Sequence, residues 1–101
     1  MDVHLVVDLI DKEQGPLRAE RLVALPAPPR EWEVVWATRV FSLRVKLVSW
    51  LWEEDPTPWV WLRRSGGTPE SITEDEDGQL AMSAHYIDEL RRSGWTVEPN
   101  Y

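Results

Sequence analysis

Two Trp-x-Trp pairs flank one short polar loop, Trp50 with Trp52 and Trp59 with Trp61. The loop between them holds three acidic residues and two prolines, a composition typical of a turn. Partners in an antiparallel hairpin step in opposite directions along the two strands, so Trp52 opposite Trp59 requires Trp50 opposite Trp61. The spacing therefore predicts an antiparallel hairpin whose four indoles share one face of the sheet.

The composition indicates one folded globular domain, because the 101 residues are 43% apolar and 29% charged. The chain has no cysteine, which excludes disulfides and thiolate chemistry. The first apolar run, residues 3–10, is interrupted by His4 and Asp8 and fits neither a signal peptide nor a membrane span. We therefore expect a cytoplasmic protein without membrane association. The formal net charge of −7 argues against general nucleic-acid binding, which needs a positive field.

An N-terminal hairpin is predicted over residues 2–25. Apolar residues occupy every second position from 3 to 9, residues 11–16 form a polar turn, and apolar residues return at 17–25. The proline-rich stretch 26–29 cannot continue the ladder, since prolines lack the amide donor, and is expected to be a stiff connector.

The segment 32–53 contains no glycine or proline. Fully extended it would span about 70 Å, whereas a domain of this size has a radius of gyration of about 13 Å. A turn near residues 37–39 therefore divides it into strands at about 32–36 and 40–53. On the longer strand, alternation assigns one face to Phe41, Leu43, Val45, Leu47 and Leu51. The opposite face then carries Ser42, Arg44, Lys46, Val48, Trp50 and Trp52.

The chain is expected to fold as one domain with three parts. Residues 1–64 form an antiparallel β domain, and residues 65–78, rich in glycine and acidic residues, form a flexible acidic loop. Residues 79–101 supply a helix and a short terminal strand that pack on the β domain.

The helix is predicted over residues 79–93, where apolar residues follow helical spacing and Gly94 stands at a typical helix end. We expect Ile87 and Leu90 to pack on the sheet, because an isolated amphipathic helix of about 15 residues is marginal in water. Residues 95–98 are predicted to form the terminal strand.

These elements define an α+β fold class: a small, strongly bent antiparallel β-sheet or SH3-like barrel of five to six strands with one C-terminal amphipathic helix. The leading hairpin, the proline-containing connector and the run ending in Val-Ser-Trp and then Val-x-Leu resemble small SH3-like barrels found in uncharacterised bacterial proteins. The resemblance covers residues 1–64 and implies a barrel, but it implies no function.

Residues suited to catalysis are few. His4 falls on a predicted strand and His85 on the predicted helix, without the spacing of a metal site or a nucleophile motif. The acidic stretch from Thr73 to Gly78 resembles a calcium loop only in part, because Ala84 stands at the twelfth position, so we interpret it as a solvated loop. We expect no catalytic residue, no metal and no cofactor.

The tryptophan face is the candidate binding surface. Its residues are Trp50, Trp52, Trp59 and Trp61 with the neighbouring cations Arg44 and Lys46. Three interpretations are open for the indoles. They form core that the C-terminal helix covers, they are exposed and hold a sugar or a cationic group, or they form the interface with a protein partner.

The leading hypothesis is a small non-enzymatic protein-interaction domain that uses an apolar and aromatic sheet surface, with a homodimer as one form. The first alternative is a ligand-binding module with exposed tryptophans. The second is an enzyme whose cleft gathers residues distant in the sequence. A nucleic-acid site that combines Arg39, Arg63 and Arg64 with the tryptophans is disfavoured by the overall acidity.

Overall fold

The N-terminal hairpin holds the two longest strands of the described chain. The computed structural model describes residues 1–50 and 57–100, and its first two strands are β1 (Asp2–Asp11) and β2 (Gly15–Ala24). They pair antiparallel along their whole length, from Asp2 opposite Ala24 to Asp11 opposite Gly15, which confirms the predicted hairpin. Gly15 has a φ of 77°, a conformation that a residue without a side chain adopts at little cost, and it closes the turn.

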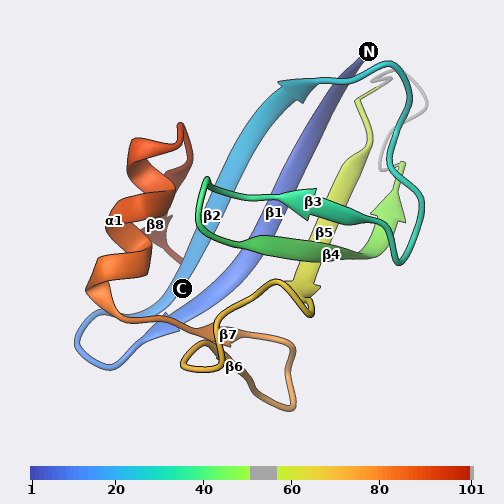
Figure 1. Cartoon of the computed structure of the whole chain (residues 1–101). Helices are drawn as coiled ribbons and strands as arrows, with labels where there is room; N and C mark the ends of the chain where they lie inside the picture. Colours follow the sequence, from blue (N-terminus) through green and yellow to red (C-terminus); the bar gives the residue numbers. More distant parts are fainter. Residues whose placement is uncertain (51–56, 101) are drawn as a thin grey trace.

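Six further strands and one helix complete the described chain (Figure 1). They are β3 (Val34–Trp36), β4 (Ser42–Ser49), β5 (Trp59–Arg64), β6 (Thr73–Glu74), β7 (Leu80–Ala81), α1 (Ala84–Arg92) and β8 (Thr96–Pro99). The strand order is β3-β4-β5-β1-β2-β8, while β7 pairs with both β1 and β6. The short strands β6 and β7 account for the excess over the five to six strands expected.

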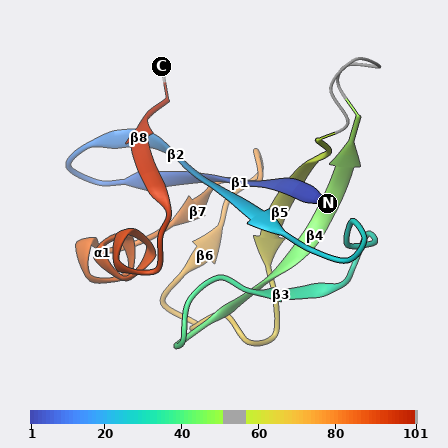
Figure 2. The same ribbon diagram turned by 90° about the horizontal axis from the view of Figure 1, so that it is seen from above.

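The sheet is mixed and open. β1 pairs antiparallel with β2 but parallel with β5 and β7, so the expectation of a purely antiparallel sheet is wrong. The connector 26–29 explains this topology, because its prolines end the ladder and the chain crosses to the far edge of the sheet before it returns towards β1. The described edge strands β3 and β8 do not pair with each other, so the sheet is not closed and an SH3-like barrel is not confirmed. The α+β class is confirmed, and Figure 2 shows β4 running steeply across the β1–β2 hairpin.

The central hairpin exists as β4 and β5, but its register differs from the predicted one. Trp61 lies opposite Leu47 rather than Trp50, and Trp59 lies opposite Ser49. The pairing of the two Trp-x-Trp motifs across the hairpin is therefore wrong.

A β-bulge at Lys46 inverts the face on which the later residues of β4 lie, but its single extra residue does not account for the whole offset from Trp50 to Leu47. The register shifts between Val45 and Leu47, so β4 carries one residue more than β5 across this point. Before the bulge Val45 shares the buried face with Phe41 and Leu43, as the alternation predicts, whereas after the bulge the alternation inverts. Val48 consequently packs against the core and Leu47 is 46% exposed.

The predicted turn between β3 and β4 is confirmed. The amides of Ala37 and Thr38 both donate to the carbonyl of Phe41, at 3.2 Å. Thr38 Oγ1 accepts hydrogen bonds from the amides of Val40 and Phe41. Trp95 donates its indole Nε1–H to the Ala37 carbonyl at 2.9 Å, which ties this turn to the C-terminal part of the chain.

The helix α1 is shorter than the predicted helix over 79–93. Its expected first turn is instead β7, whose backbone groups pair with β1 and β6. Its end is as predicted: Gly94 has a φ of 93° and its amide donates to the Arg91 carbonyl at 3.2 Å. The amide of Trp95 donates to the Leu90 carbonyl at 3.0 Å, so the helix ends in a Schellman motif.

One hydrophobic core lies between the sheet and α1. Ile87 and Leu90 are fully buried in it, which confirms the expected packing of the helix. The core also contains Val3, Leu5, Val7, Leu9, Leu17, Ala19, Phe41, Leu43, Val45, Val60, Leu62, Ile72, Leu80 and Trp95. Since odd-numbered residues of β1 face this core, the even-numbered residues face the opposite side of the sheet, which we call the outer face.

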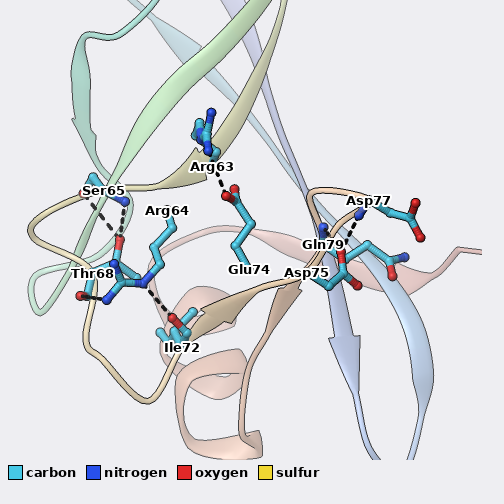
Figure 3. A network of polar contacts seen from close by, with 9 residues as sticks. All are labelled: Arg63, Arg64, Ser65, Thr68, Ile72, Glu74, Asp75, Asp77 and Gln79. Carbon is cyan, nitrogen blue, oxygen red and sulfur yellow. Dashed lines mark hydrogen bonds and ion pairs between the residues drawn. The ribbon is translucent and has the colours of Figure 1, made fainter.

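Residues 65–78, expected from composition to be a flexible loop, make specific contacts (Figure 3). Arg64 donates from Nε to the Ile72 carbonyl at 2.9 Å and from Nη2 to the Thr68 carbonyl at 3.3 Å. Ile72 is fully buried, and Thr68 Oγ1 accepts the Ser65 amide at 2.9 Å. Buried contacts of this kind favour a segment that is held against the sheet over one that moves freely.

The acidic part of this segment is a tight turn between β6 and β7 (Figure 3). Asp75 Oδ1 accepts hydrogen bonds from the amides of Asp77 and Gln79, at 3.0 and 2.9 Å. Glu74 forms an ion pair with Arg63 at 2.9 Å. Two of these carboxylates therefore have structural partners within the chain.

Replacing Ile87 by Ala removes a fully buried side chain between α1 and the sheet. We expect the free energy of unfolding, measured by urea denaturation, to fall by about 2–5 kcal/mol, the usual cost of such a truncation. His85→Ala, at an exposed position of the same helix, is the control and should change it by less than about 0.5 kcal/mol. Equal effects of the two variants would show that α1 is not part of the folded core.

Thr68→Val keeps the shape of the side chain but removes the hydroxyl that accepts the Ser65 amide. Because that buried amide loses its partner, we expect the free energy of unfolding to fall by about 1–3 kcal/mol. Limited proteolysis should then cut within residues 65–78 faster than in the unmodified chain. Thr73→Val, at an exposed position of β6, should leave both measurements unchanged. Rapid cleavage of the unmodified chain in this segment would instead support a mobile loop.

Candidate functional site

Three large apolar side chains line one side of the edge strand β3, and we call Trp32, Val34 and Trp36 the β3 stripe. They are 62%, 51% and 67% exposed, respectively. Val34 and Trp36 alternate with Val35 in β3, so they project from the same side of the strand. Trp32 precedes β3, and its ring lies by Arg44, the residue opposite Val34 in the ladder. A contiguous exposed apolar group of this kind is typical of an interaction site.

Trp32 has an unusual backbone conformation. Its φ is 72°, in the left-handed region that bulky residues rarely occupy. The Trp32 amide donates to the Val45 carbonyl and the Val45 amide donates to the Glu33 carbonyl, both at 2.8 Å. The Trp32 ring lies 6.0 Å from the guanidinium carbon of Arg44 and 5.6 Å from that of Arg63, within range of cation–π attraction. The fold thus holds an exposed indole in a strained conformation, a feature that concentrates at functional sites.

Arg44 lies next to this indole at an electrostatic cost. It stands directly opposite Arg63 in the ladder, and like charges in this position repel. Its buried Nε has no hydrogen-bond partner among the described residues. The Trp32 ring over both guanidiniums, and Glu74 bound to Arg63, offset part of this cost.

The backbone of β3 is open on the side away from β4. The Val45 amide bonds to Glu33 and the Ala37 amide bonds to Phe41, so Glu33, Val35 and Ala37 are the residues whose polar groups face β4. In an antiparallel ladder the backbone amide and carbonyl groups of successive residues point to opposite edges of the strand. The amide and carbonyl groups of Val34 and Trp36 therefore face the free edge, where no described strand pairs with them.

A second aromatic group, which we call the aromatic row, consists of His4, Trp59 and Trp61. The rings of His4 and Trp59 lie 4.0 Å apart between centroids, and those of Trp59 and Trp61 lie 6.3 Å apart. The Arg18 guanidinium carbon lies 5.0 Å from the Trp61 ring and Arg18 Nε is 2.9 Å from Asp8 Oδ1. The row is thus fixed by stacking and by an ion-paired arginine.

The aromatic row covers the outer face. The parallel ladder places Trp59 beside His4 and Trp61 beside Val6, and even-numbered residues of β1 point away from α1. Both indoles are half-buried, and Val6 is fully buried although it lies outside the main core. The interpretation that these tryptophans are core covered by the C-terminal helix is therefore wrong, because they lie on the opposite face.

The remaining residues of the predicted surface are dispersed. Trp50 follows the end of β4 and is 55% exposed, while Trp52 lies outside the described residues. Lys46 is exposed at the bulge, with its ammonium group against Gly78 of the acidic turn. The structure therefore joins Arg44 to the β3 stripe and places Lys46 by the carboxylates.

The β3 stripe was missed as a binding surface by sequence reasoning, although its residues fall in the predicted strand 32–36. The signal was present as two tryptophans and a valine at alternate positions. Their exposure depends on β3 being an edge strand, and strand order is not a local property of the sequence.

The arrangement argues against a cage for a cationic ligand. Arg18 already lies over Trp61, and Arg44 and Arg63 lie by Trp32. The Trp61 and Trp32 rings are therefore already paired with guanidinium groups of the chain, whose charge repels a cationic ligand.

The histidines are separated in the fold. His4 is in the aromatic row, 3.7 Å from Glu20, whereas His85 is exposed on α1 and contacts Tyr86 edge-on. Across residues 1–50 and 57–100, no three His, Asp or Glu side chains are grouped to hold a metal ion.

Comparison with known proteins gives no relative from which a role can be transferred. No protein-family model matches the chain, and searches among curated proteins and among solved structures gave no significant match. Within the part of the chain that the structure describes, no helix is long and apolar enough to cross a membrane.

The exposures predict a mixed tryptophan emission, since Trp95 is 3% exposed while Trp32 and Trp36 are open to solvent. We expect a red-shifted component that acrylamide quenches and a blue-shifted component that resists it. Replacing Trp32 and Trp36 by Phe should reduce the first, and Trp95→Phe should reduce the second. A uniformly blue-shifted and protected spectrum would contradict the exposed β3 stripe.

Proposed function

We propose that this protein is a small, non-enzymatic interaction domain of the cytoplasm that binds an extended segment of a protein partner along β3. The observation that carries the proposal is the coincidence of three exposed apolar side chains with a free strand edge.

Strand addition uses both features of β3. The outward amide and carbonyl groups of Val34 and Trp36 provide main-chain hydrogen bonds to an added strand, and their side chains provide apolar contacts for its alternate residues. Proteins usually protect an exposed edge with charges, proline or a covering element. The opposite edge strand, β8, ends at Pro99, whereas β3 presents large apolar groups.

The composition of the surface supports a protein partner. Tryptophan and arginine are the residue types most enriched where binding energy concentrates, and here Trp32 lies against Arg44 and Arg63. Contacts already formed within the free protein reduce the entropy that a partner must remove on binding.

A segment of another protein fits this edge better than a second copy of the chain. Each copy carries a formal net charge of −7, so electrostatic repulsion opposes association of two copies. In addition, β3 has three residues, so a symmetric pair of β3 strands offers few hydrogen bonds, whereas a partner strand can extend beyond both ends of β3.

The test is a selection of extended peptides from a displayed random library on the unmodified chain, followed by calorimetry and amide-shift mapping. We expect the shifts to centre on residues 34–36. Val34→Pro removes an amide that faces the free edge and leaves the residues bonded to β4 intact, so it should weaken binding about tenfold or more. Trp36→Ala should weaken binding as well, through lost apolar contact.

The matched control is Trp50→Ala, which removes an exposed tryptophan outside the β3 stripe and should leave binding unchanged. Peptides that bind the Val34→Pro variant as tightly as the unmodified chain would overturn strand addition. Sedimentation velocity provides a second arm: a dimer that Val34→Pro abolishes would identify a second copy as the occupant and overturn our choice of partner.

A further inference from the structure

A hollow of about 500 Å³ lies between β2, the β3–β4 turn and the C-terminal end of α1. Figure 1 shows this turn pointing towards the helix. Each of the three elements contributes one arginine to the lining, Arg21 from β2, Arg39 from the turn and Arg92 from α1. Trp36 forms part of the wall. The volume is within the range of roughly 300–1,000 Å³ that small-molecule sites occupy.

The hollow is positively charged in an acidic protein. Among the described residues that line it, the one carboxylate is Glu89, which pairs with Arg92 at 2.6 Å. Arg21 and Arg39 form no ion pair with any carboxylate of the described chain. Three guanidinium groups against one carboxylate leave two positive charges, in a chain whose net charge is −7. An anion can therefore pair with arginines that form no ion pair with a described carboxylate.

The walls of the hollow are fixed by buried contacts. The hydrogen bond from Trp95 to the Ala37 carbonyl holds the turn, and both residues are buried. The Arg21 guanidinium packs over Gly94, where an added Cβ would lie 3.5 Å from Arg21 Nε. Such preorganisation lowers the entropic cost of binding a small ligand.

We propose that this hollow binds a phosphate monoester carried by a flat ring. A phosphate dianion matches the excess of two positive charges, and its three oxygens accept hydrogen bonds from more than one guanidinium group. Trp36 is 67% exposed and offers an indole against which a flat ring can stack. Free nucleotides and phosphorylated tyrosine side chains both have this chemistry, and neither depends on strand addition at β3.

The arginines also suit a purely structural role, because cations favour the negative end of the helix dipole. That role predicts lower stability when an arginine is replaced and no saturable binding of a ligand. The two roles therefore give different results in one set of variants.

The experiment is an NMR titration of the full chain with phenyl phosphate, adenosine 5′-monophosphate and inorganic phosphate, each as a separate probe. We expect saturable shifts at the Nε–H groups of Arg21 and Arg39 and at the Trp36 indole. Arg39→Gln, in an exposed turn, should weaken phenyl phosphate binding about tenfold through loss of a charge-assisted contact. Trp36→Ala should weaken the two ring-bearing probes and leave inorganic phosphate unchanged.

Arg30→Gln is the matched control, since it removes the same charge from an exposed position outside the hollow. It should change affinity less than about twofold, because exposed charges are screened. If adenosine monophosphate binds more tightly than phenyl phosphate, the ligand of the hollow is a nucleotide. If phenyl phosphate binds more tightly, the ligand is a phosphorylated tyrosine side chain. Both results support the site. Equal losses in Arg39→Gln and Arg30→Gln, shifts that do not saturate, or reduced stability of Arg21→Gln without any binding would overturn it.

Discussion

Burial of β1 on both faces is the constraint on which the rest of the structure depends. Its odd-numbered residues from 3 to 9 lie in the main core, and Val6 on the other face is also fully buried. Its backbone pairs with β2 on one side and with β5 and β7 on the other. A strand in this position needs a cover on each face of the sheet, and this chain has one described helix for the purpose. The helix covers one face, so side chains of the sheet itself must cover the other.

The aromatic row provides that second cover. Trp61 lies beside Val6, and Arg18 lies over Trp61 with its charge held by Asp8. A tryptophan overlaid by an arginine shields an aliphatic residue while its polar edge remains in water. The bulge at Lys46 contributes to this arrangement, because it turns Leu47 towards Trp61 and returns Val48 to the core.

Local signals in the sequence predicted the local structure well. The leading hairpin, the turn before Phe41, the Schellman end of the helix at Gly94 and the burial of Ile87 and Leu90 all depend on residues close in sequence. The parallel ladders, β7 and the edge position of β3 depend on which distant segments pair, and the periodicity of the sequence does not encode that pairing.

In the candidate site, too, features set by neighbouring residues were predictable and features set by distant residues were not. That Trp59 and Trp61 share a face followed from their spacing, whereas their partners did not, because the spacing of the tryptophans does not fix the register of the two strands. The bulge at Lys46, which inverts the faces of β4, has no glycine or proline to mark it in the sequence.

Trp36 belongs to both proposed sites. It is the one member of the β3 stripe that also lines the hollow formed with Arg21, Arg39 and Arg92. An indole that stacks on a ring in the hollow is less available for apolar contact with a strand added to β3. If both proposals hold, the two ligands must therefore weaken each other by the same factor, since linkage between binding sites is reciprocal. Trp32 does not connect the sites in this way, because Arg44 and Arg63 already lie against its ring. The coupling would then depend on Trp36 and should disappear on its replacement by alanine, which leaves the free edge of β3 and the three arginines in place.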